Sequence, residues 1–221
     1  MMDKRKLIIG DYDTGTTWPW TLTELELSAP EQQTNYVTVP GRSGSVDLST
    51  AVSGLPVYND RTLTATLETS EGTRAQRETA INTMVNQLDG LRLHIVLPDD
   101  PSSYLDGRIS VARNYNDLAH ASVTISAVCY PYKLKSAETT VTASLTEADT
   151  EISLSCDRRP VVPSITTTAE TVLTWGADSY TVSAGTRQLP GIRLTQGTHT
   201  LKARTTSGTG EITITYQEGS L

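Results

Sequence analysis

Residues 39–69 read VPGRSGSVDLSTAVSGLPVYNDRTLTATLET. The end of this stretch alternates apolar and polar residues, so 61–69 predicts a half-buried strand with Leu63, Ala65 and Leu67 on its inner face. The part before it is rich in Gly and Ser, and an excursion of about twenty residues inside a compact domain is usually functional. We therefore expect residues 40–61 to form an arm that makes contacts with a partner subunit.

Turn residues and charges give this arm its expected form. Pro40-Gly41 and Ser43-Gly44 are turn formers, and residues 46–48 predict a short strand between them and the next turn. The candidate interface residues are the glycines and charged residues of the arm: Gly41, Arg42, Gly44, Asp47, Asp60 and Arg61.

The rest of the sequence up to residue 135 predicts a β-rich domain with one helix. Alternating patterns predict strands over 7–9, 21–27, 36–39, 91–97, 108–113 and 122–130. The helix is expected over 74–88, with a capping box formed by Thr73 and Gln76 and a stop at Gly90. Its apolar stripe should pack on a sheet and comprises Ala80, Ile81, Met84, Val85 and Leu88. The residues expected to face water are Arg74, Arg77 and Glu78.

Residues 136–221 have a different sequence pattern, which predicts short Thr- and Ser-rich strands separated by turns. Strands are expected over 140–145, 151–156, 161–167, 171–175, 180–183, 192–195, 199–205 and 211–216. This spacing is typical of a β-sandwich, and residues 207–210 are expected to close a hairpin between the last two strands. The chain is therefore expected to be mainly β, with one domain over 1–135 and a second over 136–221.

Composition points to a protein without nucleic-acid affinity. Apolar residues make up 37% and charged residues 19% of the chain, and the net charge of −7 is spread over both halves. Phosphate binding needs clustered Lys and Arg, which the sequence lacks. The two cysteines, Cys129 and Cys156, lie in strand patterns and read as buried thiols. The polar start of the chain has no signal-like apolar segment, so we expect assembly in the cytoplasm.

Known catalytic and cofactor motifs are absent from the sequence. It contains no GxSxG, HExxH, Walker or GxGxxG pattern, and its three histidines have no second ligand at metal spacing. Glu24 and Glu26 share a strand face, as a glycosidase pair would, but a solvated strand face has the same pattern. We expect no enzyme activity, no cofactor and no metal. Trp175 and Tyr180 flank a turn and are candidates for stacking on a sugar ring.

The first domain resembles the distal tail protein (Dit) family of long-tailed bacteriophages and prophages. The resemblance is carried by Pro40-Gly41-Arg42-Ser43-Gly44, by Val46-Asp47-Leu48 and by Tyr58-Asn59-Asp60-Arg61. It continues through the single helix, through 104–109 (YLDGRI) and through 129–133 (CYPYK). No motif match extends past Glu138, where only the layout is similar.

This resemblance implies a tail-tube-like sandwich or split barrel followed by a galectin-like sandwich. It also implies a virion structural protein at the phage tail tip, forming a hexameric ring that joins the tail tube protein to a tip protein, tail-associated lysin or fibre. DNA would pass through the ring without specific binding, which suits an acidic chain repeated around a pore. Ring closure needs a heterologous interface, and a long arm can supply one.

Two other functions fit parts of the sequence. The first alternative is a carbohydrate-binding adhesion protein that binds a host-surface glycan through Trp175 and Tyr180. The second is a wall-degrading hydrolase, which would need a carboxylate pair that no motif indicates.

Overall fold

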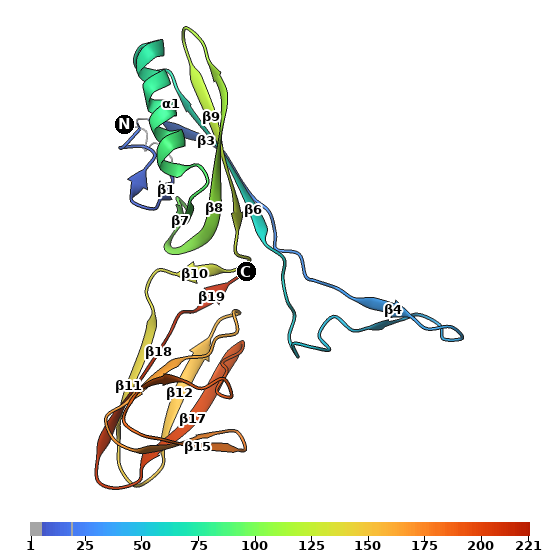
Figure 1. The fold of residues 1–221 in the computed structure, drawn as a ribbon, viewed down its shortest axis with the longest axis vertical. Coiled ribbons are helices and arrows are strands. Elements are labelled where there is room, and N and C mark those ends of the chain that lie inside the picture. The colour runs from blue at the N-terminus through green and yellow to red at the C-terminus, as the bar shows by residue number, and fades with distance from the viewer. Residues whose placement is uncertain (1–5, 19) are drawn as a thin grey trace. The chain divides into compact units, whose positions relative to one another are not determined.

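The computed structural model describes residues 6–18 and 20–221 of the chain. Within these ranges the protein is mainly β with a single α-helix, as the sequence predicts (Figure 1). The Cα trace divides into two compact units, one ending at Lys133 and one beginning at Leu134. The helix of the described residues is neither long nor apolar enough to cross a membrane.

The first unit is built on one antiparallel sheet with the strand order β2-β1-β7-β8-β9-β6-β3. Its elements are β1 (Ile8–Ile9), β2 (Tyr12–Asp13), β3 (Thr21–Leu27), β4 (Tyr36–Thr38), β5 (Ser45–Asp47), β6 (Arg61–Thr69), α1 (Arg74–Leu88), β7 (Arg92–Leu97), β8 (Asp100–Asn116) and β9 (Ala121–Cys129). The short β10 (Lys133–Lys135) follows. Strands β4 and β5 are outside the main sheet and pair with each other.

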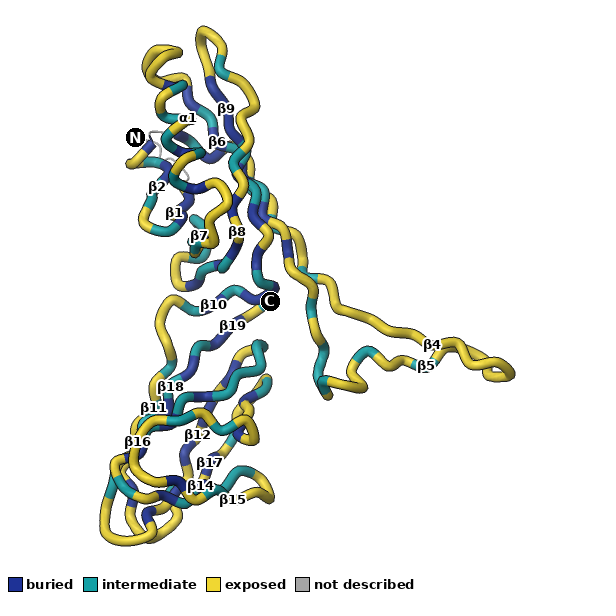
Figure 2. Tube along the Cα trace, viewed as in Figure 1, coloured by how far each residue is buried: buried dark blue, intermediate teal, exposed yellow. Residues whose placement is uncertain are grey.

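The core of the first unit lies on the inner face of the central strands. On β6, Leu63, Ala65 and Leu67 are fully buried, and they oppose Ala127, Ile125 and Val123 of β9. Figure 2 shows this alternation as buried positions along β6 and β9. The predicted phase of β6 is therefore confirmed. Strand β8 is much longer than the expected 108–113, because Leu97 already pairs with Asp100 across the turn that begins it.

Helix α1 begins and ends where the sequence predicts. The backbone N–H of Thr73 donates to Gln76 Oε1 at 2.8 Å, and the N–H of Gln76 donates to Thr73 Oγ1 at 3.3 Å, which completes the capping box. Past the C-cap, Gly90 has φ +77°, a conformation that glycine adopts without strain. Ile81, Met84 and Leu88 are fully buried against the sheet.

The expectation that Arg77 faces water is wrong. Arg77 is 3% exposed and lies four residues before Ile81, on the same stripe of the helix. Its guanidinium donates to the carbonyl oxygens of Gly72, Asp117 and Leu118 at 2.7, 2.9 and 3.1 Å. These acceptors replace water around the charge, so the side chain can be buried.

The second unit is a β-sandwich of two four-stranded sheets, β11-β18-β13-β16 and β12-β17-β14-β15. The strands of the sandwich are β11 (Thr139–Leu145), β12 (Thr150–Cys156), β13 (Ser164–Thr167), β14 (Thr171–Trp175), β15 (Asp178–Val182), β16 (Gly185–Gln188), β17 (Gly197–Thr205) and β18 (Gly210–Tyr216). The short β19 (Gly219–Ser220) follows and lies outside these two sheets. Buried residues of both sheets form its core, among them Leu154, Leu173 and Leu201 from one and Ile165, Ile212 and Ile214 from the other.

The hairpin expected at residues 207–210 is wrong. These residues connect β17 to β18, but the two strands belong to different sheets. Strand β17 already has β12 on one edge and β14 on the other, so β18 pairs with β11 and β13 instead. The segment is a crossing between the layers of the sandwich, held by a hydrogen bond from Thr205 Oγ1 to the carbonyl of Gly208 at 2.8 Å.

A second strand prediction in this unit also fails. Residues 192–195 form no strand, because only Leu194 makes an isolated bridge, to Val161. Ile192 and Leu194 are nevertheless fully buried, which explains their apolar pattern. Strand β16, which pairs with β13, is not among the predicted strands.

Candidate functional site: an exposed arm

Residues 29–60, here called the arm, leave the end of β3 and return at the start of β6. The arm therefore begins before the expected start at Pro40. Backbone hydrogen bonds join its two legs, from Asn59 to Glu31 and from Gln33 to Val57, both at 2.8 Å. Beyond these legs, β4 and β5 form a hairpin in which Val37 opposes Val46. Figure 2 shows the arm exposed along most of its length.

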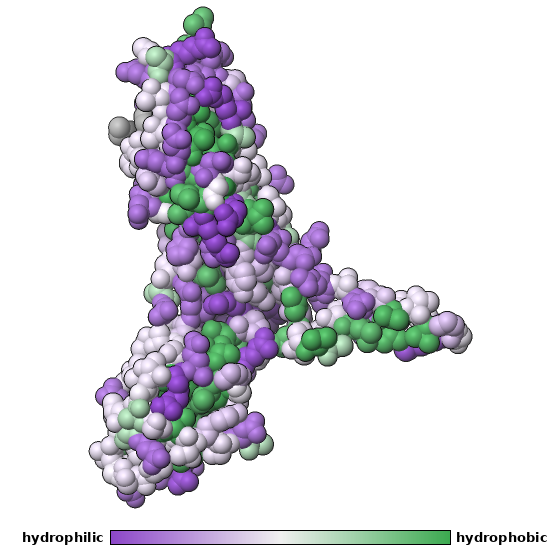
Figure 3. Space-filling model, in the orientation of Figure 1, coloured by the Kyte–Doolittle hydropathy of each residue, from purple (hydrophilic) through white to green (hydrophobic). Residues whose placement is uncertain are grey.

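The hairpin of the arm has one apolar face. Val37 and Val46 share one face of the hairpin, and Val39 and Leu48 lie one residue past the two strands, where continued alternation would put them on that same face. Val37, Val39 and Leu48 remain 42%, 40% and 40% exposed. Figure 3 shows hydrophobic residues gathered on the arm. The opposite face carries Tyr36, Thr38, Ser45 and Asp47.

An exposed apolar face of this kind is unusual for a protein that is monomeric in solution. A two-stranded hairpin is at best marginally stable by itself, and exposed apolar clusters mark interaction sites. The loop after the hairpin adds Val52, whose side chain is fully exposed. A covering partner would remove these groups from water and would order the hairpin.

Three of the sequence-predicted site residues shape the arm from within. Gly41 and Gly44 have φ +80° and +77° at the hairpin turn, a conformation that other residues rarely adopt. The carboxylate of Asp47 accepts hydrogen bonds from the side chain and the backbone N–H of Ser49, and these bonds lower the pKa of Asp47. Arg42 and Asp60 are exposed, at the turn and at the end of the arm.

Arg61 does not lie on the arm's surface, as an interface residue would. It is 6% exposed and in phase with Leu63 on the inner face of β6. Its Nε donates to the carbonyl oxygen of Ser28 at 3.0 Å, and a terminal nitrogen donates to that of Pro131 at 3.4 Å. Burial lowers the pKa of this guanidinium. Arg61 therefore belongs to the base of the arm.

The two aromatic candidates of the second unit are half-buried. Trp175 and Tyr180 both pack against the sandwich core. The Trp175 ring lies 5.4 Å from the ring of His199, and the Tyr180 hydroxyl lies so close to Gly191 that a Cβ there would collide with it. Packing within the domain buries part of both side chains, so neither presents a fully exposed ring for stacking on a sugar.

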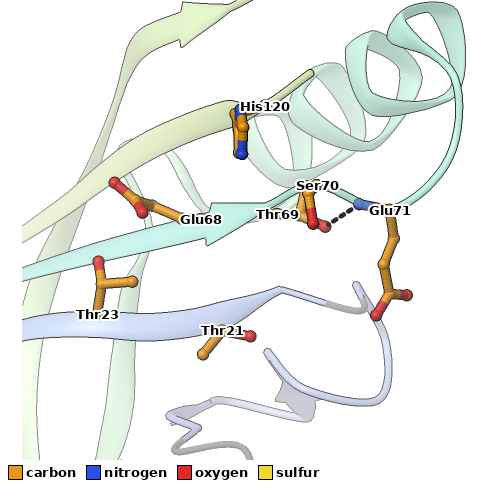
Figure 4. Close-up of a pocket in the computed structure, with 7 residues that line it drawn as sticks. All are labelled: Thr21, Thr23, Glu68, Thr69, Ser70, Glu71 and His120. Carbon is orange, nitrogen blue, oxygen red and sulfur yellow. Dashed lines mark hydrogen bonds between the residues drawn. The ribbon is translucent and has the colours of Figure 1, made fainter.

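A pocket of about 320 Å³ lies at the far end of β6 from the arm. Its lining consists of Thr21, Thr23, Glu68, Thr69, Ser70, Glu71 and His120 (Figure 4). The backbone N–H of Glu71 donates to Thr69 Oγ1 at 3.2 Å. In the part of the chain that the structure describes, no group of three or more His, Cys, Asp or Glu could hold a metal ion. The pocket and the arm base are separated by the length of β6, roughly 25 to 30 Å at strand geometry.

Comparison with solved structures relates this architecture to a phage protein. The crystal structure of the Dit protein (gp 19.1) of SPP1 superposes with a TM-score of 0.70 and 18% sequence identity, over 98% of this chain and 99% of that one. The chain has a Dit-like fold. The SPP1 Dit protein is described as a paradigm of the hub adsorption apparatus in phages that infect Gram-positive bacteria. No family model and no curated protein matches the sequence.

The Dit-like fold brings together motifs that are far apart in the sequence. Arg61 opposes Cys129 on β9, and Cys129 opposes Gly107 on β8. The Tyr58 ring lies 6.0 Å from that of Tyr132 in an edge contact. This convergence was not predicted, although the shared phase of Arg61 and Leu63 in an alternating strand is a usable signal.

Proposed function

We propose that this protein is a distal tail protein of a bacteriophage, a virion structural protein whose copies close into a hexameric hub ring. The ring would connect the tail tube to the tail tip or baseplate. The Dit-like fold over nearly the whole chain supports this role. The observation that carries it is the exposed arm with its apolar face, because a ring requires a surface on each copy that fits a different surface on the next.

Burial of the arm's apolar side chains would contribute favourable free energy to such an interface. Full burial of a Val or Leu side chain is worth about 1.5 to 3 kcal/mol. Val37, Val39 and Leu48 are each about two-fifths exposed, so covering each one would gain roughly 1 kcal/mol. Several such contacts per subunit, repeated around a closed ring, would hold the ring together even where each contact is weak.

The charge of the chain suits a ring with a channel. Copies with a net charge of −7 each would repel the phosphates of DNA, so DNA could pass through without binding. In this proposal the ring contacts the tail tube protein on one side. On the other it contacts a tip protein, a tail-associated lysin or a fibre. It acts at the tail tip after assembly in the host cytoplasm, and it performs no catalysis.

The arm can be removed at a point where its two legs are already hydrogen-bonded to each other. Deleting residues 34–56 and joining Gln33 to Val57 by Asn-Gly keeps a two-residue turn between hydrogen-bonded legs. We expect the wild-type chain to form rings in light scattering and negative-stain microscopy as its concentration rises. The deletion variant should stay a folded monomer over the same range. An unchanged oligomer would contradict the role of the arm.

Point substitutions separate the apolar face from the arm as a whole. Val37→Ser with Leu48→Ser should weaken the ring contact by roughly 2 kcal/mol, about 30-fold in dissociation constant. The matched control exchanges the cross-strand pair on the opposite face, Thr38→Ser with Ser45→Thr. This control should leave assembly unchanged. Equal weakening by both double variants would count against docking through the apolar face.

A further inference from the structure

Arg61 is a buried cation at the base of the arm. It begins β6, on the same inner face as Leu63 and Ala65, and only 6% of it is exposed. Taking a charge out of water is costly unless other groups replace the water. No carboxylate of the described residues forms an ion pair with Arg61; its acceptors are two backbone carbonyl groups.

These two acceptors belong to different segments of the chain. Ser28 is the last residue before the arm leaves the sheet; its backbone N–H donates to the carbonyl oxygen of Thr62 at 2.9 Å, and its Oγ accepts from the N–H of Thr62 at 2.8 Å. Pro131 lies in the segment that ends the first unit. Arg61 itself is the residue at which the arm returns. One guanidinium therefore ties the outgoing leg, the returning leg and the end of the first unit together.

We call the residues linked by these contacts the arm root: Ser28, Tyr58, Arg61, Pro131 and Tyr132. The edge contact of Tyr58 with Tyr132 joins the returning leg to the same end segment. Beside the root, a Cβ on Gly107 would lie 2.6 Å from Cys129 Sγ, so β8 and β9 are closely packed there. The arm root is thus joined by the two hydrogen bonds of Arg61 and by one contact between aromatic rings.

An apolar residue could fill the space of Arg61 but could not join two carbonyl groups. The next inner positions of β6 are apolar, which shows what a purely space-filling residue looks like in this strand. A guanidinium has several N–H donors in a fixed planar arrangement, so it can hold two acceptors in one geometry. The need for a fixed geometry at this position would explain why a guanidinium is buried there despite the free-energy cost.

We propose that Arg61 is a positioning residue that fixes the direction in which the arm leaves the first unit. The importance of that direction for assembly rests on the proposed ring function, since an arm must point at its neighbour before it can dock. The fixed direction itself is a property of the single chain and can be measured without any ring.

The test measures the distance between arm and helix in the full-length chain at a concentration where it is monomeric. Spin labels are attached at Thr38→Cys on β4 and Asn86→Cys on α1, both exposed positions. The native Cys129 and Cys156 are 0% and 5% exposed, and burial raises the pKa of each thiol to about 11, so we expect neither to compete for label. We expect one narrow distance distribution with Arg61 present. Arg61→Met should lose that single peak while circular dichroism stays native.

Two further variants complete the experiment. Arg61→Lys keeps the charge but lacks the fork that reaches both carbonyl groups, so it should also broaden the distribution. Arg108→Met removes an exposed arginine of β8 and should leave the distribution narrow. A folded Arg61→Met or Arg61→Lys variant with the narrow wild-type distribution would overturn the proposal. If neither variant folds, Arg61 serves the core and the proposal also fails. Absence of rings in the wild type would count against the proposed function alone.

Discussion

Arg77→Ala would remove a buried guanidinium that ties helix α1 to the turn between β8 and β9. Arg77 is 3% exposed and donates to three carbonyl oxygens, those of Gly72, Asp117 and Leu118. Its Nε also donates to Asn116 Oδ1 at 3.3 Å. The variant therefore leaves four acceptors without this donor, and it leaves a space beside the helix.

The expected loss follows from these contacts. Hydrogen bonds to charged groups are worth about 1.5 to 3 kcal/mol each, but bonds that share one donor group do not add. Relief from burying the charge offsets part of the loss. We expect Arg77→Ala to lower the free energy of unfolding of the first unit by about 3 to 5 kcal/mol, a large share of the roughly 5 to 15 kcal/mol that domains have.

Urea unfolding followed by tryptophan fluorescence gives the measurement. Trp18 and Trp20 are buried in the core of the first unit, so their emission reports its unfolding. The matched control is Arg74→Ala, an exposed arginine on the same helix, which should change stability by less than about 0.5 kcal/mol. Equal stabilities of the two variants would refute the role given to the Arg77 contacts.

Two further predictions concern the arm and the strands beside its base. Gly107→Ala should destabilise the first unit by about 1 to 3 kcal/mol in urea unfolding, because its Cβ would lie 2.6 Å from Cys129 Sγ. Adding Cys129→Ala should recover part of that loss. Strictly additive effects of the two substitutions would contradict the contact. For Asp47, hydrogen bonds from Ser49 hold the pKa of the carboxyl below its ordinary value of 3.8. Its contribution to the hairpin is therefore fully present above pH 3.8 and lost as the pH falls through the lowered pKa, which the amide resonance of Ser49 should follow in NMR. Asp47→Asn should remove that pH dependence, and an identical titration in this variant would contradict the assignment.

Local signals in the sequence were sufficient for most of the first unit. The helix over 74–88 was predicted to the residue, because its capping box and its terminal glycine act within one turn of the chain. Strand β6 was predicted equally well from its period of two. Such features depend on neighbours along the chain, which a sequence displays directly.

Which strands pair with each other could not be predicted from such local patterns. The pattern of residues 199–216 indicates two strands and a turn, and this suits a hairpin as well as a crossing between two sheets. The outcome is decided by β12 and β14, which occupy both edges of β17. Those strands lie far away in the sequence, so no local pattern of the turn could reveal the result.

The two buried arginines show a different reason for error, and it bears on the arm. Charge alone predicts an interface position for Arg61 and a solvent-facing position for Arg77, whereas the period of their elements predicts inner faces for both. Phase was the better guide because each cation is surrounded by backbone carbonyl groups rather than by water. In both cases two acceptors come from segments distant in the sequence, Ser28 and Pro131 for Arg61 and Asp117 and Leu118 for Arg77. A charged residue in the phase of a buried face therefore indicates a place where separate segments are joined, and at Arg61 one of those segments is the arm on which ring assembly is proposed to depend.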